Sequence, residues 1–183
     1  MLLTGIDNHQ TGVATIPEVL PREQVGQPGY TMSLEPGVMT IAARLQPQGY
    51  RTLMTGKWHL GSGEGDLPSN HGFERSFALD ASGADNWDDK SYMPYYREAP
   101  WYEDGEPAAL PDDFYSSEFI VDRMIDYLAE TDASKPFFAY LGFQAVHIPV
   151  QAPAEITERY RDTYSGGWQD LREARWQKAK ALG

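Results

Sequence analysis

The 183-residue sequence contains no cysteine and comparatively few basic residues. Without cysteine, a disulfide framework, a thiolate-bound zinc site and a cysteine nucleophile are all excluded within this chain. The 15 lysines and arginines face 27 aspartates and glutamates, which gives a formal net charge of −12 at pH 7. That balance argues against a protein that binds nucleic-acid phosphates, because such proteins need a basic face. Hydrophobic residues still make up 41% of the chain, so a buried core is expected.

Long apolar runs are absent as well. No stretch approaches the roughly 20 apolar residues that a transmembrane helix needs, so we expect no transmembrane segment. Residues 1–7, MLLTGID, have no basic beginning and too short an apolar stretch for a signal peptide. The lack of cysteine suits a reducing or an oxidising compartment, and the localisation therefore stays open.

Most of the negative charge lies in residues 62–118, which hold 14 acidic and 3 basic residues. This segment has little periodicity and predicts a long, irregular acidic insertion or loop. Two interpretations stay open for it, a solvated acidic loop and the rim of a substrate pocket. The segment is also rich in aromatic residues: Trp87, Tyr92, Tyr95, Tyr96, Trp101, Tyr102, Phe114 and Tyr115.

Two helix-then-strand units flank the acidic segment. Residues 38–45 have the apolar spacing of a helix and precede a predicted strand at 50–56. Residues 116–130 repeat the helical pattern and precede the apolar run 137–143, which is typical of a strand covered on both faces. The order predicts an α/β fold with a mainly parallel sheet. We expect a helical end over 154–183 and treat residues 1–183 as one partial domain.

Polar side chains follow the two predicted strands. Lys57 and His59 come directly after the first, and His147 follows the second. Because ligands bind beyond the carboxyl ends of strands in α/β sheets, these residues are candidates for one pocket. A lysine and two histidines suit an anionic substrate, although each alone can also be a surface or structural residue. His9 and His71 lie in turn sequences and are interpreted as structural.

The residues around the first predicted strand form a longer motif, which is more specific than the positions of single residues. Residues 49–61, GYRTLMTGKWHLG, resemble the second signature of the type I sulfatases, G-Y-x-[ST]-x-x-x-G-K-W-H-L-G. Residues 1–5 (MLLTG), 70–74 (NHGFE), 136–141 (PFFAYL) and 146–149 (VHIP) also look like segments of bacterial arylsulfatases. The resemblance implies an alkaline-phosphatase-like α/β/α sandwich. It also implies an arylsulfatase-type hydrolase that converts a sulfate monoester to an alcohol or phenol plus sulfate.

The resemblance further implies roles for the candidate residues. Lys57 would contact the sulfate and the oxygen of formylglycine, His59 would hydrogen-bond the formylglycine diol, and His147 would contact the sulfate and the leaving oxygen. In the family, formylglycine is made from a cysteine or serine in the signature C-x-[PS]-[ST]-R, which this sequence lacks. Ca²⁺ is expected for the family, but no ligands for it are identified here. The chain is therefore expected to be an internal fragment of the catalytic domain that is inactive alone.

Two other functions stay open at this point. A phosphate or phosphonate monoester hydrolase of the same superfamily would use similar contacts to a tetrahedral anion. Alternatively, residues 62–118 could make the chain a non-catalytic module that binds carbohydrate or protein. Because this acidic segment should repel a sulfated polysaccharide, the expected partner is a small sulfate ester.

Overall fold

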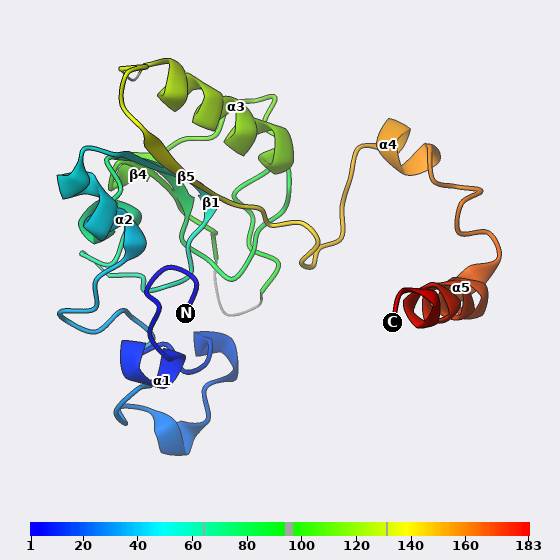
Figure 1. Cartoon of the computed structure of the whole chain (residues 1–183), viewed down its shortest axis with the longest axis horizontal. Coiled ribbons are helices and arrows are strands. Elements are labelled where there is room, and N and C mark those ends of the chain that lie inside the picture. Colours follow the sequence, from blue (N-terminus) through cyan, green and yellow to red (C-terminus); the bar gives the residue numbers. More distant parts are fainter. Residues whose placement is uncertain (64, 94–96, 131) are drawn as a thin grey trace. The chain divides into compact units, whose positions relative to one another are not determined.

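The computed structural model describes residues 1–63, 65–93, 97–130 and 132–183 (Figure 1). The chain forms two compact units, Met1–Val150 and Gln151–Gly183. Two aromatic residues of the acidic segment, Tyr95 and Tyr96, lie outside the described residues.

The first unit is built on a five-stranded mixed sheet with the order β4-β3-β2-β1-β5. β1 runs parallel to both of its neighbours, β2 and β5, whereas β3 and β4 are antiparallel additions beyond β2. The strands are β1 (Arg51–Lys57), β2 (Arg75–Leu79), β3 (Trp101–Glu103), β4 (Glu106–Ala108) and β5 (Phe137–Gly142).

Alternation along β1 and β2 sends apolar side chains to both faces of the sheet. Leu53 and Phe77 pack on one face with helix α3 (Ser116–Ala129), which Figure 1 shows lying across the sheet. Met54 and Ala78 point to the other face, toward a second core cluster that includes Ala42 of helix α2 (Ile41–Leu45). Burying each large apolar side chain stabilises the fold by about 1.5–3 kcal/mol. The α/β fold with parallel central strands confirms the predicted fold class.

β5 differs from its prediction. It is the last strand of the sheet among the described residues, and its side chains are only partly covered. Phe137, at its start, is 56% exposed. A continuous apolar run therefore indicated a strand correctly here, but not one buried on both faces.

Helix α2 is shorter than the predicted 38–45 because Thr40 caps it. The Thr40 Oγ1 accepts a hydrogen bond from the Ala43 N–H at 3.1 Å, so the helix begins at Ile41. It continues into a 3₁₀ turn, η3 (Gln46–Gln48). Helix α3 matches its prediction closely, and the side chain of its N-cap residue, Tyr115, makes no capping hydrogen bond. The hydroxyl of Ser116, the first residue of the helix, donates to Asn86 Oδ1 at 2.7 Å.

Residues 62–118 differ from the irregular segment that we expected. They contain the 3₁₀ turn η4 (Pro68–His71) and the strands β2, β3 and β4, which extend the sheet. β3 and β4 form a hairpin whose turn residues Asp104 and Gly105 have φ values of 52° and 95°. Asp-Gly is a frequent pair in such hairpin turns. The remaining short helices of the unit are α1 (Asn8–Thr11), η1 (Pro17–Val19) and η2 (Arg22–Gln24).

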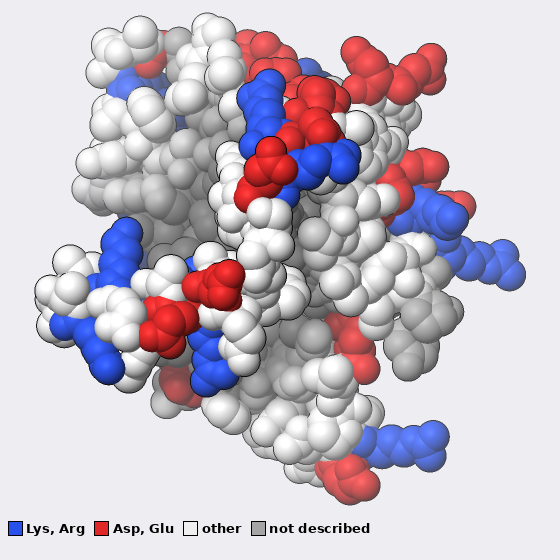
Figure 2. Space-filling view, turned by 90° about the vertical axis from the view of Figure 1, so that its right-hand side faces the viewer, with Lys and Arg blue, Asp and Glu red and all other residues white. Residues whose placement is uncertain are grey.

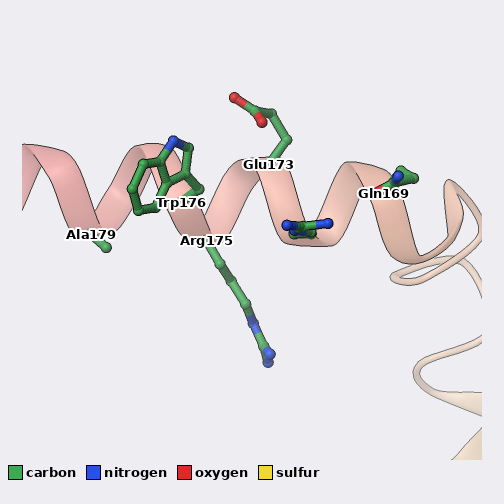
Figure 3. Close-up of a pocket in the computed structure, with 6 residues that line it drawn as sticks. Gln169, Glu173, Arg175, Trp176 and Ala179 are labelled. Atoms are coloured by element: carbon green, nitrogen blue, oxygen red, sulfur yellow. The ribbon is translucent and has the colours of Figure 1, made fainter.

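The second unit contains helices α4 (Ala154–Glu158) and α5 (Gly167–Leu182), and none of its residues is buried. Figure 3 shows side chains of α5, with Glu173 and Arg175 pointing away from the helix in different directions. On the face shown in Figure 2, acidic and basic side chains are interspersed rather than gathered by sign. Across the described residues, no helix combines the length and apolar character needed to cross a bilayer.

Candidate active site

The candidate residues converge because β1 and β5 end at the same edge of the sheet. Gly56 of β1 pairs with Gly142 of β5, and the strands are parallel. Lys57 is the last residue of β1, His59 follows two residues later, and His147 lies five residues beyond β5. This carboxyl edge is the place where open α/β sheets bind ligands.

Lys57 is held at this edge by the chain that follows β2. Its Nζ donates a hydrogen bond to the carbonyl oxygen of Ser82. Partial burial lowers the pKa of Lys57 below its ordinary value, and the negative charge of Glu18 opposes this effect. A partly dehydrated ammonium group interacts more strongly with an anion than one in bulk water does.

His147 lies beside the same short segment. A Cβ atom at Gly83 would be 3.4 Å from His147 Nδ1, so the residue after Ser82 passes directly beside this imidazole. His147 Nδ1 is 2.8 Å from the carbonyl oxygen of Ile148 and 3.4 Å from the hydroxyl of Tyr92. Because a carbonyl only accepts hydrogen bonds, the shorter contact favours a proton on Nδ1. Nε2 then remains for a ligand.

His59 completes the group and brings in a residue that sequence reasoning missed. Its side chain is 14% exposed, and its Nε2 lies 3.4 Å from Oε1 of Glu18 on η1. Burial is the largest influence and lowers the pKa of His59. The charges of Lys57 and His147 lower it further, while Glu18 raises it. Because both neighbouring charges act on His59, the three predicted residues belong to one electrostatic environment.

Asp80 is a second residue that the sequence did not single out. It directly follows β2, is 8% exposed, and its Oδ1 accepts a hydrogen bond from the Ser62 hydroxyl at 2.9 Å. Burial raises the pKa of Asp80, Asp66 adds to this rise, and the Ser62 hydrogen bond opposes it. Asp80 thus carries a carboxylate that folding partly removes from water.

The variant Asp80→Asn is expected to gain stability over the wild type as the pH rises. Because the pKa of Asp80 is raised in the folded state, the folded chain holds more protons than the unfolded chain between the two pKa values. The wild-type free energy of unfolding therefore falls across that interval, whereas asparagine does not titrate. Urea unfolding from about pH 4 upward measures the difference. Asp112→Asn, at an exposed acid, controls for the lost charge, and a difference independent of pH contradicts the prediction.

The other two histidines lie in different surroundings. The ring of His71 packs against Trp58, with ring centroids 5.7 Å apart, and burial lowers the pKa of His71. His9 is exposed, and its Nδ1 lies 3.2 Å from Asp7 Oδ1. Both placements suit the structural roles expected for them.

The described residues do not fit a calcium ion. Within these ranges, no three histidine, aspartate or glutamate side chains come together in a way that could hold a metal. Calcium prefers six to eight oxygen ligands.

Comparisons with known proteins find sequences similar to this chain. The family model described as Sulfatase matches residues 1–182. The arylsulfatase of Klebsiella aerogenes is 37% identical over 190 residues, which cover 100% of this chain and 39% of that protein. A sulfatase of Schizosaccharomyces pombe is 38% identical over 196 residues, covering 100% of this chain and 35% of that protein. The chain thus spans little more than a third of the length of these relatives.

The fold is also found among solved structures. The crystal structure of Ps i-CgsB matches with a TM-score of 0.70 at 21% sequence identity. The match covers 88% of this chain and 36% of that chain.

Proposed function

The chain belongs to the sulfatase family, and from that premise we propose that it supplies the sulfate-binding part of an arylsulfatase-type active site. The proposal is supported by the places of Lys57, His59 and His147 at or beyond the carboxyl ends of the parallel strands β1 and β5, and by the electrostatic effect of Lys57 and His147 on His59. One ammonium group and two imidazoles at this edge would match the oxygens of a sulfate monoester. The substrate class is a small sulfate ester, cleaved to an alcohol or phenol plus sulfate.

Each residue has a distinct part in this proposal. Hydrolysis breaks the bond between sulfur and the ester oxygen, and negative charge develops on the departing oxygen. Lys57 offsets charge on the sulfate oxygens from a fixed position beside the Ser82 carbonyl. In its doubly protonated form, His147 donates the Nε2 proton to the leaving oxygen and keeps Nδ1–H on the Ile148 carbonyl. His59 exchanges a proton with the attacking group.

The attacking group is not part of this chain. By resemblance to the family, an aldehyde hydrate on a modified cysteine or serine attacks sulfur and later releases sulfate. The sequence has no cysteine and no C-x-[PS]-[ST]-R signature. We therefore expect the 183-residue chain to bind a sulfate ester without turning it over.

The aromatic side chains of residues 62–118 argue against the alternative of a non-catalytic module that binds carbohydrate. Trp87 and Tyr115 stack on each other with centroids 5.1 Å apart, and Trp101 and Phe114 are buried. Rings occupied by protein contacts are less available to stack on a sugar. Tyr92, in turn, reaches His147 at the proposed site, which supports the interpretation of the segment as a pocket rim.

Sulfate binding to the 183-residue chain tests the proposal. We expect sulfate to shift the NMR signals of His59 and His147 in a saturable titration. Lys57→Met should weaken this binding about tenfold or more, because a hydrogen bond to a charged group contributes roughly 1.5–3 kcal/mol. Lys135→Met, at an exposed lysine, is the matched control and should bind as the wild type does.

Parallel titrations separate the alternatives. Tighter binding of an aryl phosphate than of an aryl sulfate would favour the phosphate or phosphonate monoester hydrolase. Saturable binding of a neutral glycan, with no response to sulfate, would favour the binding module. No saturable response to sulfate at the two histidines contradicts the proposed function.

A further inference from the structure

A buried carboxylate lies inside the proposed anion site. The side chain of Glu18 is 3% exposed, and its Oε1 is 3.4 Å from Nε2 of His59. Glu18 also acts electrostatically on Lys57. A carboxylate repels a sulfate ester, so its burial among the groups that would bind that ester calls for a purpose other than substrate contact.

The contact with His59 indicates that purpose. A carboxylate only accepts hydrogen bonds, so Glu18 and His59 are matched when Nε2 of the imidazole carries a proton. With Nε2 committed to Glu18, the other ring nitrogen, Nδ1, has its lone pair available in the neutral imidazole. A carboxylate that orients an imidazole in this way is a recurring arrangement in general acid–base catalysis.

The backbone gives a second, independent indication that His59 is held in a set orientation. Its φ is +57°, a left-handed conformation that non-glycine residues adopt uncommonly. Such a strained conformation persists where the surroundings hold it. In this conformation, the His59 side chain reaches the Glu18 carboxylate.

We propose that Glu18 is a positioning residue, which accepts a hydrogen bond from Nε2–H of His59 and thereby presents His59 Nδ1 as the proton acceptor of the site. The proposal rests on the proposed function for its catalytic meaning, but the Glu18–His59 contact itself is open to measurement without any substrate. Glu18 also acts on Lys57, and it opposes the lowering of the His59 pKa that Lys57 and His147 cause. The carboxylate thus keeps proton exchange at His59 possible within a positive site.

Two substitutions separate the hydrogen bond from the charge. Glu18→Gln keeps the shape and an oxygen acceptor but removes the charge, so the pKa of His59 should fall further below its ordinary value. Glu18→Ala removes both, so the Nε2–H proton of His59 should also lose its protection from exchange with water. Glu23→Gln, at an exposed acid of η2, is the matched control and should change neither property.

The experiment is an NMR pH titration of the chain with ¹⁵N-labelled histidine in sulfate-free buffer. The wild type should show a slowly exchanging His59 Nε2–H signal at low field. Glu18→Gln should move the His59 titration midpoint to lower pH. Glu18→Ala should also lower this midpoint, and the His59 Nε2–H signal should disappear. The Trp58 indole N–H, which donates to the Asp66 carbonyl at 2.6 Å, reports whether the fold around His59 is intact in each variant.

Unchanged His59 midpoints in both variants would overturn the proposal. If Glu18→Ala loses the Trp58 signal, the isosteric Glu18→Gln variant decides the question through its midpoint alone. Failure of the chain to bind sulfate would contradict the proposed function, yet the titration of His59 would still report on Glu18. The two failures are therefore distinguishable.

Discussion

Gly56→Ala is expected to destabilise the first unit by more than about 4 kcal/mol, a large part of the roughly 5–15 kcal/mol that keeps a single domain folded. Gly56 forms the last pair between β1 and β5, opposite Gly142, and has a φ of +100°. A Cβ atom there would be 2.2 Å from the carbonyl oxygen of Gly142. An alanine must therefore push two hydrogen-bonded strands apart in addition to adopting a left-handed backbone.

Gly49→Ala is the control that separates these two costs. Gly49 has a similar φ of +87°, but a Cβ atom there would meet nothing within 4 Å. It should cost only the backbone strain, about 1–3 kcal/mol. Urea unfolding followed by tryptophan fluorescence measures both variants. Equal losses for Gly56→Ala and Gly49→Ala would show that the approach of β5 to β1 is not what requires glycine.

Gly56 and its partner Gly142 together explain why the candidate site forms at this edge of the sheet. A Cβ atom at Gly142 would lie 2.6 Å from the carbonyl oxygen of Lys57, so neither strand tolerates a side chain at this crossing. β5 can therefore approach β1 closely at the point where Lys57 leaves the sheet. The stability of the β1–β5 pairing and the position of the Lys57 ammonium group therefore both depend on the close approach of Gly56 and Gly142.

The elements that the sequence predicted are those with a clear period or an uninterrupted apolar run. Helix α3 has one buried face with Ile120, Met124 and Tyr127, and its pattern gave its limits within one or two residues. The strand β1 was recognisable for a similar reason. Local periodicity reports which side of an element is covered, and α3 is covered as its pattern indicates. β1 is buried at every position from 52 to 56, so its alternation indicated the strand but not its burial on both faces.

The missed strands lack such a signal. β2 is buried on both faces and has only five residues, and β3 and β4 have three residues each. They are held by pairing with neighbours rather than by their own pattern. The Asp104–Gly105 pair was the one local sign of the β3–β4 hairpin, and it could have indicated that hairpin.

The site divides in the same way. The sequence could single out Lys57, His59 and His147. They lie at or beyond the ends of strands and within segments that resemble sulfatase motifs. Glu18 lies in a 3₁₀ turn between prolines and reaches His59 from 41 positions earlier in the chain, which only the tertiary fold brings about. Contacts of that kind leave no trace in spacing or composition.

Lys57→Ala is expected to lower kcat about 10²–10³-fold in an active sulfatase that contains this chain. That is the usual loss when one preorganised donor to a developing negative charge is removed. The test system is a graft in which residues 1–183 replace the matching segment of the Klebsiella aerogenes arylsulfatase, with which they share 37% identity. The rest of that enzyme then supplies what the 183 residues lack, and hydrolysis of an aryl sulfate measures kcat.

Lys135→Ala in the same graft is the control for removal of one lysine and should leave kcat unchanged, because Lys135 is exposed in the turn before β5. Lys57 differs from Lys135 in its partial burial and in its fixed hydrogen bond to Ser82, so it can stabilise charge without first being ordered. A loss of kcat confined to Lys57 therefore assigns the effect to its position at the sheet edge. An active graft in which Lys57→Ala keeps the full kcat, or a folded graft without any activity, contradicts the assignment of the sulfate-binding role to this edge.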